Sequence, residues 1–212
     1  SAQIVRPESG LQSTRRIQCL AGQGAGRHWA ALTNTVGFVD PLHSTGIAHT
    51  LFSVSRLADI LLSKTGAVER QQSLQRYSES LVHEIRCVDE LVEGCYEAIP
   101  SFRLWCLWGM LYFAAATSME QTTDAGICQA SFLLADDRQF RAVLREARQR
   151  LAIARHVRDS ERIAAETTFD AWLKSAIEPW NLVGLFDDAC DNLYARTAAP
   201  AEGIRPETGR TT

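Results

Sequence analysis

Apolar residues recur at helical spacing over most of the chain after residue 44. Over residues 45–64 they step by four and by three, which predicts one helix with a single apolar face. Residues 67–99 continue this spacing as a second, longer helix, and Pro100 ends it. The apolar face of the first helix consists of Ile47, Leu51, Val54, Ala58 and Leu61. The other face of the second is charged and carries Glu69, Arg70, Arg76, Glu84, Arg86, Glu90 and Glu93.

A third helix is predicted to begin at Ser101 or Phe102, and it is apolar on nearly every side. A helix without a polar face is either buried all round or lines a cavity. Its aromatic residues therefore suit the wall of a substrate pocket, and plain core packing is the alternative. The candidate pocket residues are Trp105, Trp108, Tyr112 and Phe113.

The C-terminal third is predicted to hold two more helices after a mixed loop at 121–135. Asp136 or Asp137 caps the first of them, which reaches about residue 158. Its outer face is rich in arginine and is read as a solvated face, with a weak basic stripe as the alternative. The next helix covers about 161–177, followed by an ordered apolar loop at 180–186, a short helix at 187–194 and a disordered tail at 197–212. The inward residues of the two longer helices are Phe140, Leu144, Ala147, Leu151 and Ala154, then Ile163, Phe169, Trp172, Leu173 and Ala176.

The segment before residue 45 reads as short strands. Residues 15–20 and 29–32 fit strands, and the glycine-rich stretch 22–26 is predicted to be the turn between them. These glycines do not have the spacing of a dinucleotide-binding fingerprint. The predicted fold class is mainly α, with a short β segment at the N-terminus. The predicted domains are 1–44, 45–196 as a helical domain, and the tail 197–212.

Composition excludes several classes of function. A net charge of −3 over 212 residues gives no electrostatic case for binding nucleic acid. The longest apolar run, 104–116, is shorter than the roughly 20 residues that cross a bilayer, and no signal segment is recognised, so we expect no membrane partner. Six cysteines without a CxxC pair predict reduced thiols and a cytoplasmic location. The five histidines form no metal-binding pattern, so no metal site is predicted.

One stretch, residues 37–47, combines several features of a ligand-binding turn. A short apolar segment leads through Pro41 to the start of the first helix, where Ser44 or Thr45 can cap it. Gly46 allows a ligand to approach the backbone. The unpaired N–H groups and the positive end of the helix dipole suit an anion or a polar ring. His43 adds an imidazole, a candidate acid or base.

This stretch resembles the FxxPxxSxG signature of the flavin-dependent halogenases, the tryptophan halogenase group. Phe38, Pro41, Ser44 and Gly46 match its four fixed positions. The resemblance continues less specifically through Tyr77, Asp89, Cys95-Tyr96, residues 111–115 and residues 180–185. It implies that the segment before the first helix is the end of an α+β FAD-binding domain and that the helices form the substrate domain.

The resemblance also implies roles for individual residues. Thr45 and Gly46 would hold a chloride or bromide or the flavin edge, Ile47 would pack near the flavin ring, and His43 would act as acid or base. FAD is the implied cofactor of the full-length parent, with a small aromatic or electron-rich molecule as substrate. The implied cofactor-binding residues are Gly37, Phe38, Asp40, Pro41, Ser44, Thr45, Gly46 and Ile47.

The chain departs from the halogenase pattern at three places. It lacks the GxGxxG unit, the WxWxIP segment and the essential lysine, since Lys64 and Lys174 are its lysines and neither fits that role. His43 stands where the tryptophan halogenases place Glu. Thr33-Asn34 stands where related flavoproteins carry Gly-Asp.

We therefore expect the C-terminal part of a halogenase-like oxidoreductase, a monooxygenase or halogenase that is inactive alone. Its expected partners are a flavin reductase or a separate FAD-binding half. The alternative is a non-catalytic helical interaction or scaffold protein that dimerises through the apolar face of the second or third helix.

Overall fold

The computed structural model describes residues 17–124 and 131–187. The chain divides into two compact units, Ser1–Ile85 and Arg86–Thr212, and the division falls inside one long helix, α3, which covers Ala67–Ala98. Helices dominate the described residues, with a few two-residue strands in the first unit, so the predicted mainly α fold class with a short β segment is confirmed. The domain boundaries expected from the sequence remain a prediction.

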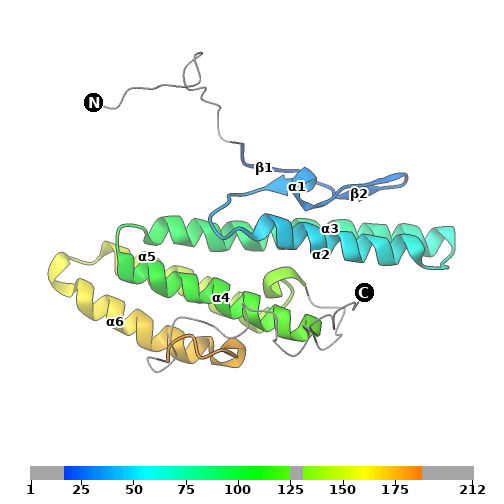
Figure 1. Ribbon diagram of the computed structural model, residues 1–212. Coiled ribbons are helices and arrows are strands. Elements are labelled where there is room, and N and C mark those ends of the chain that lie inside the picture. The colour runs from blue at the N-terminus through cyan, green and yellow to red at the C-terminus, as the bar shows by residue number, and fades with distance from the viewer. Residues whose placement is uncertain (1–16, 125–130, 188–212) are drawn as a thin grey trace, which may run out of the picture. The chain divides into compact units, whose positions relative to one another are not determined.

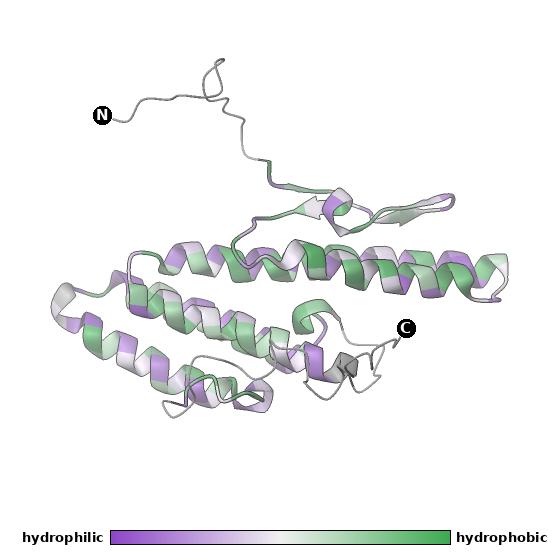
Figure 2. Ribbon diagram, in the orientation of Figure 1, coloured by the Kyte–Doolittle hydropathy of each residue, from purple (hydrophilic) through white to green (hydrophobic). Residues whose placement is uncertain are grey.

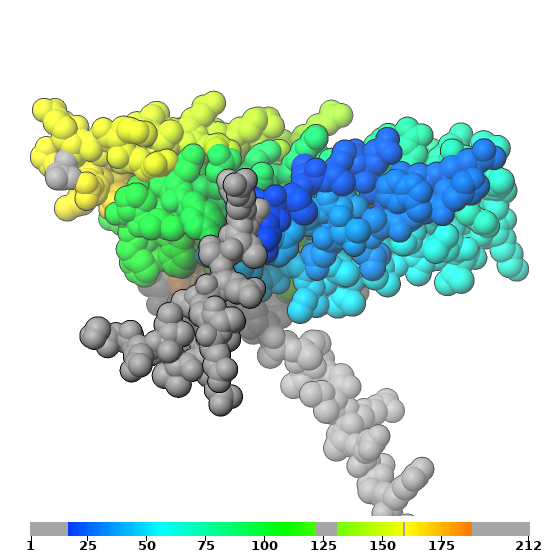
Figure 3. All heavy atoms as spheres, turned by 90° about the horizontal axis from the view of Figure 1, so that it is seen from above, coloured from blue at the N-terminus to red at the C-terminus, as the bar shows by residue number. Residues whose placement is uncertain are grey.

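The first unit packs short strands and one short helix along a helical hairpin, α2 with the first half of α3 (Figure 1). Strand β1 pairs antiparallel with β4, with Cys19 opposite Phe38, and β2 pairs antiparallel with β3, with Ala25 opposite Ala30. Figure 3 shows the strand region, in darker blue, lying against α2 and α3. The elements are β1 Cys19–Leu20, β2 Ala25–Gly26, β3 Trp29–Ala30, α1 Thr33–Val36, β4 Gly37–Phe38, α2 Thr45–Leu62 and α3 Ala67–Ala98.

The pairing corrects the predicted role of the glycine-rich stretch 22–26. It is not a turn between the two predicted strands, because Ala25 and Gly26 are themselves strand β2 and the partner of β1 is β4. Gly24 lies close against α3, where its backbone N–H donates to Ser78 Oγ at 2.8 Å. A Cβ on Gly24 would lie 3.2 Å from the Leu81 side chain. The small residue therefore lets this segment lie close to the helix.

The core of the first unit lies where the strands and α1 meet α3. Its buried members are Ala25, Val36, Tyr77, Leu81, Val82 and Ile85. Helix α2 contributes to this core from one edge, through Leu57 and Ile60, which are partly buried. The apolar face predicted for this helix is not its buried face.

Helix α2 buries the face opposite to the one that the sequence predicted. Its described bounds agree closely with the predicted 45–64, but Ile47, Leu51 and Leu61 are 77%, 64% and 55% exposed. The buried positions are polar instead, namely Thr45, His49 and Ser53. The α2 ribbon is coloured largely green in Figure 2, which marks its apolar residues.

The second unit is a set of helices packed on the second half of α3. The predicted cap of α5 is confirmed, since Asp137 Oδ1 accepts hydrogen bonds from the N–H groups of Gln139 and Phe140. All five predicted inward positions of α5 are buried. The elements are α4 Phe102–Asp124, η1 Phe132–Leu134, α5 Arg138–His156, α6 Asp159–Ala176 and η2 Glu178–Trp180.

Two predictions in this unit are wrong. Helix α4 continues to Asp124, so the loop predicted at 121–135 begins later. Ile163 was predicted to be an inward residue of α6, yet it is largely exposed. The residues that α6 buries are Glu166, Phe169 and Leu173. The predicted helix at 187–194 and the tail lie outside the described residues, apart from Asp187.

Helices α3 and α4 cross at a glycine and a tryptophan. Trp108 is almost fully buried, and its Nε1 donates to the Leu91 carbonyl at 2.7 Å. A Cβ on Gly94 would lie 2.0 Å from ring atoms of Trp108. The indole therefore occupies the space that any larger side chain at position 94 would need.

The arginine-rich face of α5 is paired with the acidic face of α3. Arg141 contacts Glu90 at 2.7 Å, Arg148 contacts Glu93 at 2.7 Å, and Arg155 contacts Glu97 at 3.5 Å. These three arginines are therefore paired with acidic residues of another helix. This pairing disagrees with the alternative of a basic stripe on α5. None of the helices in the described part combines the length and the apolarity needed to cross a membrane.

Candidate functional site

The turn at 37–47 joins β4 to α2 and is built from local hydrogen bonds. Asp40 Oδ1 accepts a hydrogen bond from the Leu42 N–H at 2.8 Å, and the Pro41 carbonyl accepts one from the Ser44 N–H at 2.9 Å. The aspartate side chain thus closes a turn of its own before the backbone closes the next. Because Pro41 has no backbone N–H, its position in the turn leaves no backbone donor unpaired there.

Ser44 is the N-cap residue of α2 and has a left-handed backbone, with φ 52° and ψ 26°. Its side chain makes no capping hydrogen bond, so the predicted position is right and the predicted capping contact is absent. The first N–H groups of a helix have no partner within the helix. The side chain of Ser44 therefore leaves the N–H groups at Thr45–Ile47 without a cap from that residue.

Asn34 lies beside Gly46. A Cβ on Gly46 would lie 3.4 Å from Asn34 Oδ1 and 3.8 Å from Nδ2, so the amide group borders the first turn of α2. The short helix α1, which carries Asn34, is joined directly to β4. The fold therefore brings together a residue and a motif that are twelve positions apart in the chain.

The other motif residues have different degrees of burial. Thr45 is buried and Gly46 partly buried, while Ile47 projects its side chain outward. His43 is partly buried, and this burial lowers the pKa of its imidazole, against the opposing effect of the Asp40 charge. A group with this lowered pKa is held neutral near pH 7, so it can accept a proton.

A buried polar network lies behind the turn, on the inward face of α2. Glu84 of α3 is completely buried; its Oε2 lies 2.9 Å from His49 Nε2, and both of its oxygens accept hydrogen bonds from Arg56, at 2.9 and 2.6 Å. Thr33 Oγ1 lies 3.1 Å from the His49 carbonyl oxygen and 3.2 Å from Ser53 Oγ. This network connects α1, α2 and α3.

Two aromatic rings lie beside Arg56, one of the members of this network. The Arg56 guanidinium lies 4.7 Å from the Phe52 ring centre and 5.8 Å from that of Tyr77. The Tyr77 hydroxyl donates to the Ala31 carbonyl at 2.9 Å. Burial raises the pKa of Tyr77, opposed by its hydrogen bond with Ser53 and by the Arg56 charge.

Sequence reasoning missed this network, and it placed Glu84 on the charged face of the second helix, opposite the apolar face. A signal was present, because Thr45, His49, Ser53 and Arg56 recur at helical spacing opposite the apolar stripe. That pattern does not show which of the two faces is buried.

The predicted pocket residues on α4 belong to the second unit and divide into two groups. Trp108 lies in the core against Gly94, which agrees with the plain-core alternative for that residue. Trp105 and Phe113 are partly exposed, and the Tyr112 and Phe113 rings meet edge to face at 5.3 Å. A Cβ on Gly109 would meet no atom of the described residues within 4 Å.

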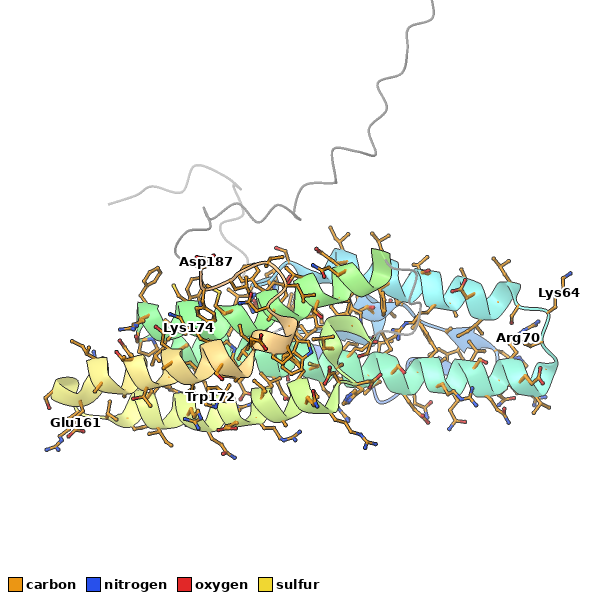
Figure 4. The ribbon with its side chains drawn as sticks, turned by 90° about the horizontal axis from the view of Figure 1, so that it is seen from below. Lys64, Arg70, Glu161, Trp172, Lys174 and Asp187 are labelled. Atoms are coloured by element: carbon orange, nitrogen blue, oxygen red, sulfur yellow. The ribbon has the colours of Figure 1, made fainter. Side chains whose placement is uncertain are left out.

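The described residues hold no cluster of metal ligands, and Lys64, the lysine of the first unit, lies far from the turn. Among the described residues, no group of three or more histidine, cysteine or acidic side chains is placed to bind a metal ion. Lys64 follows the C-terminal end of α2, about 27 Å along the helix from the motif at its N-terminal end. Figure 4 shows Lys64 in the connection between α2 and α3, and Lys174 on α6.

Two curated halogenases match the chain in sequence. Monodechloroaminopyrrolnitrin halogenase PrnC of Pseudomonas fluorescens is 29% identical over 96 residues, which are 43% of this chain and 16% of that protein. Tetracycline 7-halogenase of Kitasatospora aureofaciens is 26% identical over 132 residues, which are 55% of this chain and 23% of that protein. No family model matches the chain.

A solved halogenase also shares the fold. The crystal structure of halogenase PltM in complex with phloroglucinol and FAD matches with a TM-score of 0.61 and 22% identity. The chain is halogenase-like. The match covers 80% of this chain and 38% of PltM, so the halogenase-like chain spans less than half the length of the proteins that it resembles.

Proposed function

We propose that this chain is the C-terminal part of an FAD-dependent halogenase-like oxidoreductase, a monooxygenase or a halogenase. The observation that carries the proposal is the turn at 37–47, which matches the signature at every fixed position and starts a helix whose first N–H groups are uncapped. The likeness of the fold to a halogenase that binds FAD supports it.

The residues of the turn fit one wall of a flavin and halide site. Thr45 and Gly46 would hold a chloride or bromide, or the edge of FAD, through backbone N–H groups. Ile47, exposed beside them, offers an apolar side chain for the flat ring. Asn34 offers its amide to a hydroxyl of the cofactor from the other side of Gly46. His43 would take up or release a proton.

FAD would supply the redox chemistry with O₂, and the chain's own residues would bind and orient the reactants. We propose a small aromatic or electron-rich molecule as the substrate. The partly exposed aromatic face of α4 supports this, through Trp105, Tyr112 and Phe113. Trp108 is not proposed as a substrate contact, because the core encloses it.

The chain covers 16% and 23% of its curated relatives, so we propose that it has little or no activity alone. A flavin reductase and the remaining FAD-binding half, as a preceding segment or a separate chain, would complete the enzyme. Tight stoichiometric quenching of FAD fluorescence by this chain alone would overturn that part of the proposal.

A glycine-to-alanine pair tests the site itself. Gly46→Ala fits sterically, since its methyl would lie at ordinary contact distance from Asn34, but this methyl would occupy the gap between Gly46 and Asn34. Gly109→Ala is the matched control, a helical glycine with open space around it. Bromide with FAD, titrated into the ¹⁵N-labelled chain, should shift the amide resonances of Thr45–Ile47 in the wild type and in Gly109→Ala.

Gly46→Ala should lose these shifts while unfolding at the same or a higher denaturant concentration. An unchanged response in Gly46→Ala, or wild-type shifts that spare Thr45–Ile47, would refute the proposed site. This readout does not require turnover.

The second candidate function is a helical interaction or scaffold protein without chemistry. The exposed apolar residues near the start of α4, Phe102 and Trp105, whose rings stack at 6.1 Å, favour it. It predicts a dimer through the apolar faces of α3 or α4. Size-exclusion chromatography with light scattering tests it, and a monomer over a wide concentration range would contradict it.

A further inference from the structure

The carboxylate of Glu84 is an unusual group to find at the centre of the first unit. It is completely buried, and both oxygens are used by the side chains of Arg56 and His49. Ion pairs in such a place are weak stabilisers, because desolvation offsets much of the attraction, and well-packed apolar residues often do as well. Their best supported use is to select one arrangement of helices over others.

The contacts of Glu84 are arranged to select one arrangement of α2. His49 and Arg56 lie seven residues apart, two helical turns on the same side of α2. A single carboxylate that binds both allows one rotation and one axial position of α2 relative to the first half of α3. The bidentate contact with Arg56 is directional, unlike a contact with a lysine.

The network also reaches the turn. His49 follows Thr45 by one helical turn, and its backbone carbonyl lies 3.1 Å from Thr33 Oγ1 of α1. The next residue of α1, Asn34, borders Gly46. The position of α2 therefore sets both the direction of the uncapped N–H groups and the gap between Gly46 and Asn34.

We propose that Glu84 is a positioning residue, which through His49 and Arg56 holds the first turn of α2 and Asn34 at the separation that the ligand requires. The inference rests on the proposed function for its ligand. Its geometric part, the placement of Thr45–Ile47, is measured without any ligand.

The experiment compares Glu84→Gln with Glu90→Gln, the same change in the same helix at an ion pair with Arg141 in the second unit. Amide resonances are recorded for both folded variants and for the wild type. Glu84→Gln should shift the resonances of Asn34 and Thr45–Ile47, and Glu90→Gln should leave them in place. Bromide affinity, where the wild type binds it, should fall on the order of tenfold. Losses of this size follow the mutation of residues that orient metal-binding side chains through hydrogen bonds.

If Glu84→Gln does not fold, Arg56→Lys replaces it, since this side chain is partly exposed and keeps its charge while losing the two-pronged contact. It should move the same resonances by a smaller amount. Unmoved resonances at Thr45–Ile47, or shifts spread evenly over the first unit, would overturn the inference, because a merely structural role lowers stability without redirecting this turn. A wild type whose Thr45–Ile47 resonances do not respond to bromide with FAD would refute the proposed site and leave the geometric test valid.

Discussion

Ser44 has a left-handed backbone at the point where the motif turns into α2, with φ 52°. A β-branched side chain is strained in that region and glycine is not. We expect Ser44→Val to lower the free energy of unfolding by about 1–2 kcal/mol, and Ser44→Gly to change it by less than about 1 kcal/mol. Urea unfolding followed by circular dichroism measures both variants, and equal losses would contradict this reason.

The imidazole of His43 should make folding sensitive to acid. Burial lowers its pKa in the folded state below the usual 6.5, so the unfolded chain binds the proton more tightly. Its contribution to stability is complete above about pH 6.5 and is lost as the pH falls through the lowered folded pKa. The difference in unfolding free energy between wild type and His43→Gln should therefore change between pH 7 and pH 5.

The matched control for this measurement is His28→Gln, at an exposed histidine of the same unit. A difference between wild type and His43→Gln that stays flat with pH would show that His43 does not titrate as expected.

At this scale the sequence predicted the members of the turn but not their conformations. The spacing of Phe38, Pro41, Ser44 and Gly46 identified the motif. The left-handed backbone of Ser44 was not readable, because serine rarely adopts it and the surrounding turn imposes it. The contact between Asn34 and Gly46 depends on how α1 packs beside α2, which no local pattern contains.

At the scale of elements, helix positions were predictable because they depend on local periodicity and stop signals. Pro100 ends α3 near the predicted residue, and Asp137 caps α5 as predicted. Which face of a helix is buried was less predictable. Helix α2 has an apolar stripe and a polar stripe, and Glu84 with Arg56 and His49 makes the polar stripe the buried one.

The crossing of α3 and α4 gives a sharp prediction for one glycine. We expect Gly94→Ala to lower the free energy of unfolding by about 3 kcal/mol, because its methyl group would overlap the buried Trp108 ring. Tryptophan fluorescence during urea unfolding should report the loss and a changed indole environment.

Gly109→Ala serves as the control, since no atom in the described part of the chain lies within 4 Å of its new methyl. It should leave stability unchanged or raise it by up to about 1 kcal/mol. Equal effects of the two substitutions would mean that the indole does not require the space above Gly94.

At the scale of the whole molecule, the outward face of α2 is an apolar surface that the described part of the chain leaves exposed. Such surfaces promote association. We expect the double change Leu51→Gln and Leu61→Gln to reduce concentration-dependent self-association. It should also reduce the binding of a dye that reports exposed apolar surface. Thermodynamic stability should stay within about 0.5 kcal/mol per site, because both side chains are largely exposed.

Light scattering over a range of concentrations measures this association. The control is the pair Ile153→Gln and Ile163→Gln, at exposed positions of the second unit. If both pairs act alike, the face of α2 has no special role in association.

The sequence by itself determined the mainly α composition of the described chain, the bounds of its long helices, the cap of α5 and the halogenase-like turn. Each of these depends on residues close together in the chain, so composition, spacing and motif contain it. The tertiary structure decided that β1 pairs with β4, that α2 buries its polar stripe, that Trp108 belongs to the core, and that Asn34 borders Gly46. These depend on partners distant in sequence, and a helix with two usable faces buries the one for which the fold supplies a matching group, here the carboxylate of Glu84.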